Sequence, residues 1–189
     1  MIKIGILGDI GSGKSYVAEN FGYPVFNADL EVSKLYEKDR NIFIKLKKIL
    51  PKYIFSFPVN KKEISTAVLA NKDNLKKIVK IVHIEIKKKM NIFLKKNKNK
   101  KIIILDIPLL LENKINRKND ILVFVQSKKS DISKRLRGRK NFNLRLLNKF
   151  RNIQISLSYK KKKSDFIIKN NFTKRSVKTG INKILREIL

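Results

Sequence analysis

The chain of 189 residues, 42% of them hydrophobic, suits one compact domain with a real core and small insertions. It has no cysteine, which excludes a disulfide framework and a cysteine-based zinc site, and no apolar run approaches the roughly 18 residues of a membrane span. The formal net charge of +31 indicates either nucleic-acid binding or a composition shifted toward lysine, isoleucine and asparagine by A/T-rich codons, and we favour the second interpretation.

Strands and helices are predicted to alternate along the chain. Strands are expected at Ile2–Leu7, Tyr23–Asn27, Lys101–Ile107, Ile121–Val125 and Asp165–Ile168. Helices are expected at Asp29–Tyr36 (Asp29 being a candidate N-cap), Lys14–Phe21, Asp39–Leu50, Lys61–Leu69, Asp73–Lys96, Ser130–Leu136, Leu144–Leu157 and Ser176–Leu189. The lysine-rich run Lys160–Lys163 is interpreted as a solvated face or turn. This alternation predicts a parallel α/β sheet, and the absence of a signal peptide predicts a cytoplasmic protein.

The segment Gly8–Ser15 fits G-x-x-x-x-G-K-[ST] at every fixed position, with a strand before it and a helix after it. Glycines let the backbone curl so that successive N–H groups point at phosphate oxygens, and the helix N-terminus adds partial positive charge. Lys14 should reach the β- and γ-phosphates of ATP, and Ser15 should offer its hydroxyl to Mg²⁺. The predicted ATP-binding residues are Gly11, Ser12, Gly13, Lys14, Ser15 and Tyr16.

This phosphate loop alone leaves GTPases, ATPases and small-molecule kinases open. The chain has no Asn-Lys-x-Asp guanine-recognition motif and is too short for most motor ATPases, which favours a kinase. Asp106 ends a buried strand, where a carboxylate can reach Mg²⁺ through water or can simply cap the strand end.

Several segments in order resemble the dephospho-coenzyme A kinase family over nearly the whole chain. The matching segments are Asp9–Ser15, Asn27-Ala28-Asp29, His83-Ile84, Asp106–Glu112 (Asp-x-Pro-Leu-Leu-x-Glu), Arg139 with Gln154 fifteen residues on, and Ser164–Phe172. The run Asp106–Glu112 is the most diagnostic of these segments. The chain departs from the family pattern at Asp9 (usually Gly), Asn27 (usually Asp), Ile84 (usually Pro), Lys140 (usually acidic) and Phe172 (usually Gly).

The resemblance implies a three-layer P-loop sandwich with about five parallel strands as a single domain over residues 1–189. It also implies a helical acceptor-binding region at 39–98 and a lid at 137–148. By resemblance, Asp29 is the base for the acceptor hydroxyl and Arg139 is a lid residue that acts with Lys14 in catalysis. The implied acceptor contacts are Asp29, His83, Pro108, Leu109, Leu110 and Glu112, the implied adenine contacts are Asn170 and Asn171, and the implied metal contacts are Ser15 and Asp106.

Each of these roles has a plainer alternative. Arg139 fits a solvated basic loop, His83 a packed helix residue, Glu112 a surface carboxylate paired with a lysine, and Asn170 with Asn171 an ordinary turn.

The predicted reaction is transfer of the γ-phosphoryl group of ATP to the ribose 3′-hydroxyl of dephospho-coenzyme A, with Mg²⁺. Two alternatives remain: another small-molecule kinase, such as one for nucleoside monophosphates, and a basic nucleic-acid-binding P-loop protein. No specific nucleic-acid or membrane partner is expected, and the sequence does not indicate an oligomeric state.

Overall fold

The computed structural model describes residues 1–140 and 142–189. The chain contacts divide it into two compact units. The sheet unit comprises Met1–Asn27, Asn97–Phe142 and Gln154–Leu189, and the helical unit comprises Ala28–Lys96 and Asn143–Ile153. The prediction of one domain over residues 1–189 stays a prediction.

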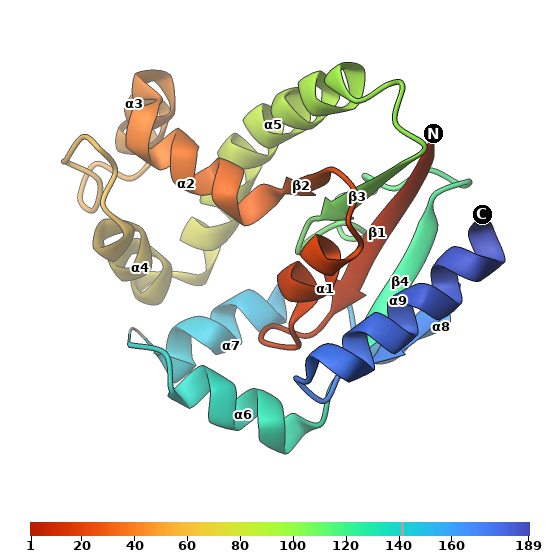
Figure 1. The fold of residues 1–189 in the computed structure, drawn as a ribbon. Coiled ribbons are helices and arrows are strands. Elements are labelled where there is room, and N and C mark those ends of the chain that lie inside the picture. The colour runs from red at the N-terminus through yellow and green to blue at the C-terminus, as the bar shows by residue number, and fades with distance from the viewer. Residues whose placement is uncertain (141) are drawn as a thin grey trace. The chain divides into compact units, whose positions relative to one another are not determined.

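The sheet unit contains five parallel strands in the order β2-β3-β1-β4-β5. Their bounds are β1 Ile2–Gly8, β2 Val25–Asn27, β3 Ile102–Asp106, β4 Ile121–Gln126 and β5 Phe166–Lys169. The helices of this unit are α1 Lys14–Asn20, α6 Lys129–Arg137, α8 Leu157–Lys162 and α9 Lys174–Ile188. Figure 1 shows β1 lying between β3 and β4. The predicted parallel sheet is confirmed, and all five strands end at the same edge.

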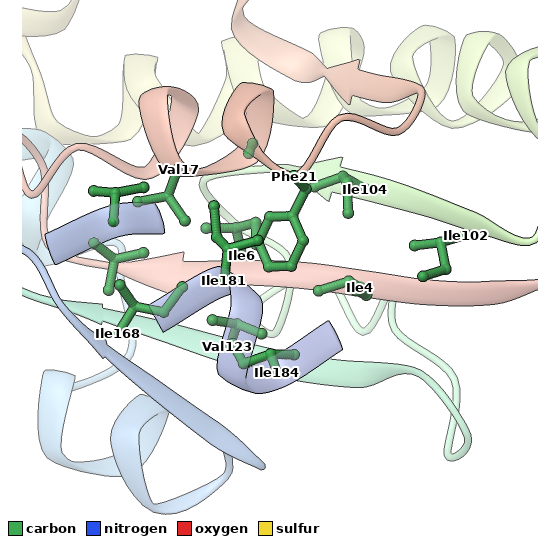
Figure 2. Packing of buried hydrophobic residues seen from close by; sticks show 13 residues of the cluster. Ile4, Ile6, Val17, Phe21, Ile102, Ile104, Val123, Ile168, Ile181 and Ile184 are labelled. Atoms are coloured by element: carbon green, nitrogen blue, oxygen red, sulfur yellow. The ribbon is translucent and has the colours of Figure 1, made fainter. Parts of the chain in front are cut away.

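The core of the sheet unit follows from alternation along β1. Ile4 and Ile6 are fully buried and pack with Val17 of α1 and Ile181 of α9 (Figure 2). Because successive side chains of a strand point to opposite faces, Gly5 faces the other side of the sheet. A Cβ added at Gly5 would lie 2.5 Å from the Leu110 side chain, so a larger residue there would force the buried Leu110 side chain to shift. Helix α8 also packs against β1.

The helical unit contains α2 Ala28–Lys38, α3 Arg40–Ile49, α4 Lys61–Ala70, α5 Lys72–Lys96 and α7 Leu144–Asn152. Three of these helices begin at side-chain caps: the carboxylate of Asp39, the amide of Asn60 and the amide of Asn143 each accept a backbone N–H of the first turn. Along α5 the buried apolar residues recur at helical spacing, as predicted; they are Leu75, Ile78, Val82, Ile86 and Met90. In the described parts of the chain, no helix is both long and apolar enough to cross a membrane.

Two helix predictions are wrong in detail. The predicted helix Leu144–Leu157 ends at Asn152, and a separate helix begins at Leu157 after the Ser156 hydroxyl accepts the Tyr159 N–H. The cap at Ser156 starts a new helix axis, which the apolar spacing alone does not indicate. The candidate N-cap Asp29 lies inside helix α2, because the helix begins one residue earlier, directly after β2.

Candidate active site

The phosphate loop joins β1 to α1 in the sheet unit. Gly13 has φ 92°, a left-handed conformation that side chains disfavour, and a Cβ added there would lie 2.5 Å from the amide nitrogen of Asn170. The loop closes with a turn in which the Ser12 N–H donates to the Asp9 carbonyl at 3.1 Å. Helix α1 then begins with the Val17 N–H donating to the Gly13 carbonyl. The loop therefore has the backbone curl that the motif predicts.

The side chains of two residues hold the phosphate loop in place through hydrogen bonds to its backbone. The carbonyl of Ser12 accepts the Ser127 hydroxyl at 3.0 Å and the Asn170 amide at 2.9 Å. The Asn170 side chain is buried and also accepts the Phe172 N–H at 2.8 Å. Asn171 accepts the N–H and hydroxyl of Thr173 at the start of α9. Asn170 therefore positions the loop, and the predicted adenine contacts of both asparagines stay predictions.

Sequence reasoning missed Ser127. It follows β4 just as Asn170 follows β5, so its place after a strand was the available signal.

Lys14, Ser15 and Asp106 come together beside this loop. The Lys14 ammonium donates to the carbonyls of Gly8 and Asp9 at 3.3 and 2.9 Å. Asp106 is 3% exposed at the end of β3, and the Ser15 hydroxyl hydrogen-bonds to it. Burial raises the pKa of the Asp106 carboxyl, while the Ser15 hydrogen bond and the charge of Lys14 oppose that shift. The parallel sheet therefore brings Asp106 next to Lys14 and Ser15, which lie about ninety residues before it in the sequence.

The oxygen donors at this place fit Mg²⁺. Mg²⁺ is commonly bound by one or two protein oxygens together with waters and substrate phosphates. Ser15 and Asp106 supply a hydroxyl and a carboxylate beside the predicted phosphate position. Within residues 1–140 and 142–189, no group of three or more histidine or acidic side chains could hold a metal by itself.

Arg139 lies just beyond α6. Its N–H donates to the Leu136 carbonyl, and its own carbonyl accepts the Phe142 N–H, so the backbone turns here. The side chain is exposed. The predicted lid 137–148 runs from the end of α6 into α7, and Asn141 within it lies outside the described residues.

Asp29 and His83 belong to the helical unit, whereas the phosphate loop, Asp106 and Arg139 belong to the sheet unit. Asp29 is exposed in the first turn of α2, and its carbonyl accepts the Ser33 hydroxyl. His83 is partly exposed on α5. Burial lowers the pKa of the His83 imidazole, and the nearby charge of Lys87 lowers it further. The predicted roles of both residues stay predictions.

The segment after β3 divides into core and partly exposed residues. Leu110 is fully buried, whereas Pro108 and Leu109 are partly exposed. Glu112 forms an ion pair with Lys160 at 2.7 Å, and only 1% of the Lys160 side chain is exposed. The interpretation of Lys160 as a solvated lysine is wrong, because the fold supplies a buried carboxylate for it. The predicted acceptor contacts of Pro108, Leu109, Leu110 and Glu112 stay predictions.

Comparison with known proteins decides which kinase family this arrangement represents. The family model described as dephospho-CoA kinase matches residues 2–175. The chain belongs to the dephospho-CoA kinase family. The dephospho-CoA kinase of Wolbachia pipientis wMel is 34% identical over 187 residues, which cover 96% of this chain and 95% of the relative. The dephospho-CoA kinase activity predicted from the sequence, an ATP-dependent phosphorylation in the last step of coenzyme A biosynthesis, is therefore confirmed.

Solved structures share the fold. TT1252 from Thermus thermophilus aligns with a TM-score of 0.75 at 21% identity, covering 100% of this chain and 98% of the other. The dephospho-CoA kinase from Campylobacter jejuni aligns with a TM-score of 0.61 at 23% identity, covering 98% of this chain and 96% of the other. The predicted P-loop kinase fold is confirmed. The predicted cytoplasmic location stays a prediction.

Two departures from the dephospho-CoA kinase pattern have visible structural consequences. Phe172, at a position where the pattern has glycine, has φ 64°, and its ring lies 5.0 Å below the Arg135 guanidinium. This contact offsets part of the cost of a left-handed conformation in a non-glycine residue. Asn27 pairs in register with Asp106 and donates its amide to that carboxylate at 3.1 Å. An aspartate at position 27 would instead place two carboxylates side by side.

Proposed function

We propose that this chain transfers the γ-phosphoryl group of ATP to the ribose 3′-hydroxyl of dephospho-CoA through the residues that surround its phosphate loop. The observation that carries the proposal is the convergence of Lys14, Ser15 and Asp106 at the ends of β1 and β3. The acceptor oxygen forms the new P–O bond while the bond to the bridging oxygen of ADP breaks. The hydroxyl proton passes to a carboxylate.

The phosphate loop binds the donor. Its backbone N–H groups and the N-terminus of α1 face the phosphates, and Lys14 moves its hydrogen bonds from the Gly8 and Asp9 carbonyls to phosphate oxygens. Ser127 and Asn170 keep the loop in this curl through the Ser12 carbonyl. Such preorganised donors stabilise charge in the transition state without reorganising during the reaction.

Ser15 and Asp106 would hold Mg²⁺, and a bound Mg²⁺ would supply positive charge to neutralise the phosphates of the donor. Asn27 donates to one oxygen of Asp106 and Ser15 also hydrogen-bonds to the carboxylate, so the carboxylate is held in a defined orientation beside the loop.

Asp29 accepts the proton of the acceptor hydroxyl, and Arg139 on the lid neutralises charge on the transferring group. The acceptor is bound by the helical region 39–98, including His83, together with the segment Pro108–Glu112. Closure of the lid 137–148 excludes water, which otherwise competes as an acceptor.

The test is an acceptor panel with Lys14→Ala as the loop variant. Wild-type protein should phosphorylate dephospho-CoA and show little activity on AMP, CMP or shikimate, in a coupled assay for ADP with the product position verified by NMR. Lys14→Ala should lower turnover by about 10²–10³-fold, because it removes a charge aimed at the transferring phosphate. The exposed Lys183→Ala is the matched control.

A better kcat/KM on a nucleoside monophosphate would overturn the acceptor assignment. Near-normal turnover of Lys14→Ala would overturn the phosphate-loop assignment. Removal of Mg²⁺ with EDTA should abolish turnover and weaken ATP binding measured by calorimetry.

A further inference from the structure

A buried polar cluster joins the segment after β3 to the segment between α7 and α8. The Glu112 Oε1 atom lies 2.7 Å from the Lys160 ammonium and accepts the Ile155 N–H at 3.0 Å. The same ammonium donates to the Gln154 side-chain carbonyl at 3.0 Å. The Glu112 and Lys160 side chains are 8% and 1% exposed. All four residues belong to the sheet unit, and the cluster lies outside the phosphate loop.

The Lys160 ammonium and the Glu112 carboxylate contact two consecutive residues that lie outside any helix. Gln154 and Ile155 lie between α7, which ends at Asn152, and α8, which begins at Leu157. They are also the first residues of the sheet unit after the chain returns from the helical unit at Ile153. Immediately before them lie α7 and the lid 137–148.

Glu112 is held through one oxygen only. Its Oε2 atom is buried and has no hydrogen-bond partner among the described residues. Removing Lys160 alone would leave a buried carboxylate that accepts the Ile155 N–H but has lost its counter-charge, which is strongly destabilising. Replacing both partners by apolar residues of similar volume removes that penalty and is often neutral for stability. Stability and positioning can therefore be separated by experiment.

We propose that Lys160, paired with Glu112, is a positioning residue for the kinase reaction, because it anchors Gln154 and Ile155 as the fixed end of the lid segment. This inference rests on the lid function proposed above. Lys160 does not touch the substrates. It acts through the Gln154 side chain, and Glu112 acts through the Ile155 backbone.

The central variant is the double substitution Glu112→Leu with Lys160→Met. It should melt near the wild-type temperature while kcat falls about ten-fold or more, because loss of a fixed geometry lowers turnover without removing a reacting group. Because Glu112 is also a predicted acceptor contact, Gln154→Met, which leaves Glu112 in place, should lower kcat in the same direction. ATP affinity by calorimetry should stay near wild type. Lys160→Met alone should lower both the melting temperature and kcat, and Lys161→Met on the exposed face of α8 should change neither.

Hydrogen exchange of the α7 amides with and without a non-hydrolysable ATP analogue and dephospho-CoA provides the second readout. Wild type should gain protection when both ligands bind, and the double variant should gain less. A double variant with wild-type kcat and wild-type protection would overturn the inference, since the pair would then serve stability alone.

If the double variant does not fold, Gln154→Met decides the matter, because it keeps the ion pair and the Glu112–Ile155 hydrogen bond and removes only the contact of Lys160 with the anchored segment. Unchanged kcat in that variant overturns the inference. Absence of ligand-dependent protection in wild type would overturn the lid proposal and this inference together. In that case the acceptor panel would still report independently on the kinase reaction.

Discussion

In the proposed reaction Asp29 accepts the proton of the acceptor hydroxyl, and its place in α2 allows this role to be tested. It is exposed in the first turn of α2, and the helix begins before it, so the carboxylate is not the cap that starts the helix. An acidic side chain in the first turn of an exposed helix contributes about 0.3–1 kcal/mol through the helix dipole. An amide at this position keeps the size of the side chain and removes the group that accepts the proton in the proposed reaction.

We expect Asp29→Asn to lower kcat by about 10²–10⁴-fold with ATP affinity nearly unchanged, because an amide cannot accept the acceptor proton near neutral pH. Single-turnover phosphorylation measures the chemical step, and thermal melting of both proteins shows whether the fold survives. Asp73→Asn in the first turn of α5 is the matched control for the helix-dipole effect. A folded Asp29→Asn protein with wild-type turnover would leave the base unassigned.

Arg139 tests whether the lid contributes geometry or only charge. Arg139→Lys keeps the charge but loses the planar fork of donors that matches phosphate oxygens. We expect kcat to fall more than ATP affinity, because the contact tightens in the transition state. The exposed Arg151→Lys on α7 is the control. Weaker ATP binding at unchanged kcat would show that Arg139 attracts ATP in the ground state and does not stabilise the transition state.

At the scale of elements, helix α5 contributes both to the core of the helical unit and to the proposed acceptor-binding region. Its apolar stripe, which includes Val82 and Ile86, packs inside the helical unit, and His83 lies beside this stripe. The folded state therefore holds an imidazole partly away from water, which disfavours its charged form and lowers its pKa.

The lowered pKa of His83 predicts a loss of stability on the acid side. When the pH falls below the ordinary histidine value of about 6.5, the unfolded chain takes up the proton before the folded chain does, so the free energy of unfolding decreases. Above that pH the effect is absent. We expect the melting temperature of wild type, relative to His83→Gln, to fall between about pH 8 and pH 5. A pH-independent difference between the two proteins would contradict this.

In the turn between β5 and α9, Phe172 has a backbone conformation that non-glycine residues disfavour. Phe172 adopts a left-handed conformation that glycine adopts more readily, and Arg135 covers its ring next to Gly13 of the phosphate loop. Asn170 and Asn171 supply local hydrogen bonds that hold this turn. The turn therefore tolerates phenylalanine through local hydrogen bonds to the two asparagines and through the contact with Arg135, which lies far from it in the sequence.

The whole molecule carries a net charge of +31, which is a long-range attraction for polyanionic substrates. Both ATP and dephospho-CoA are anionic, so a basic kinase needs no nucleic-acid partner to explain its charge. Lysines supply most of this positive charge, but one lysine, Lys160, is buried in an ion pair.

We expect kcat/KM for both substrates to fall as salt rises, with kcat less affected, because salt screens attraction more than bound contacts. Binding of RNA or duplex DNA, followed by fluorescence anisotropy, should be weak at physiological salt and should decline steeply with salt. Tight binding of a particular nucleic acid at physiological salt would favour the nucleic-acid-binding alternative.

The phosphate loop, the buried strands and the parallel fold could be predicted from the sequence, because each rests on residues that are contiguous. Gly8–Ser15 contains its glycines, lysine and hydroxyl within eight positions. The apolar runs of β1, β3 and β4 are also contiguous, and such runs indicate buried strands. Asp106 was recognisable for this reason, since it directly follows such a run.

Only the tertiary structure decided which polar side chains meet. The Asn170 amide reaches the Ser12 carbonyl across 158 residues, and the Asn27 amide reaches Asp106 across 79. The register of neighbouring strands sets such contacts, and no local pattern encodes that register. Lys160 stands within a run of four lysines and is distinguished from them only by the buried Glu112 that the fold brings to it. Burial is a property of the packed chain, so charge and spacing along the sequence could not indicate it.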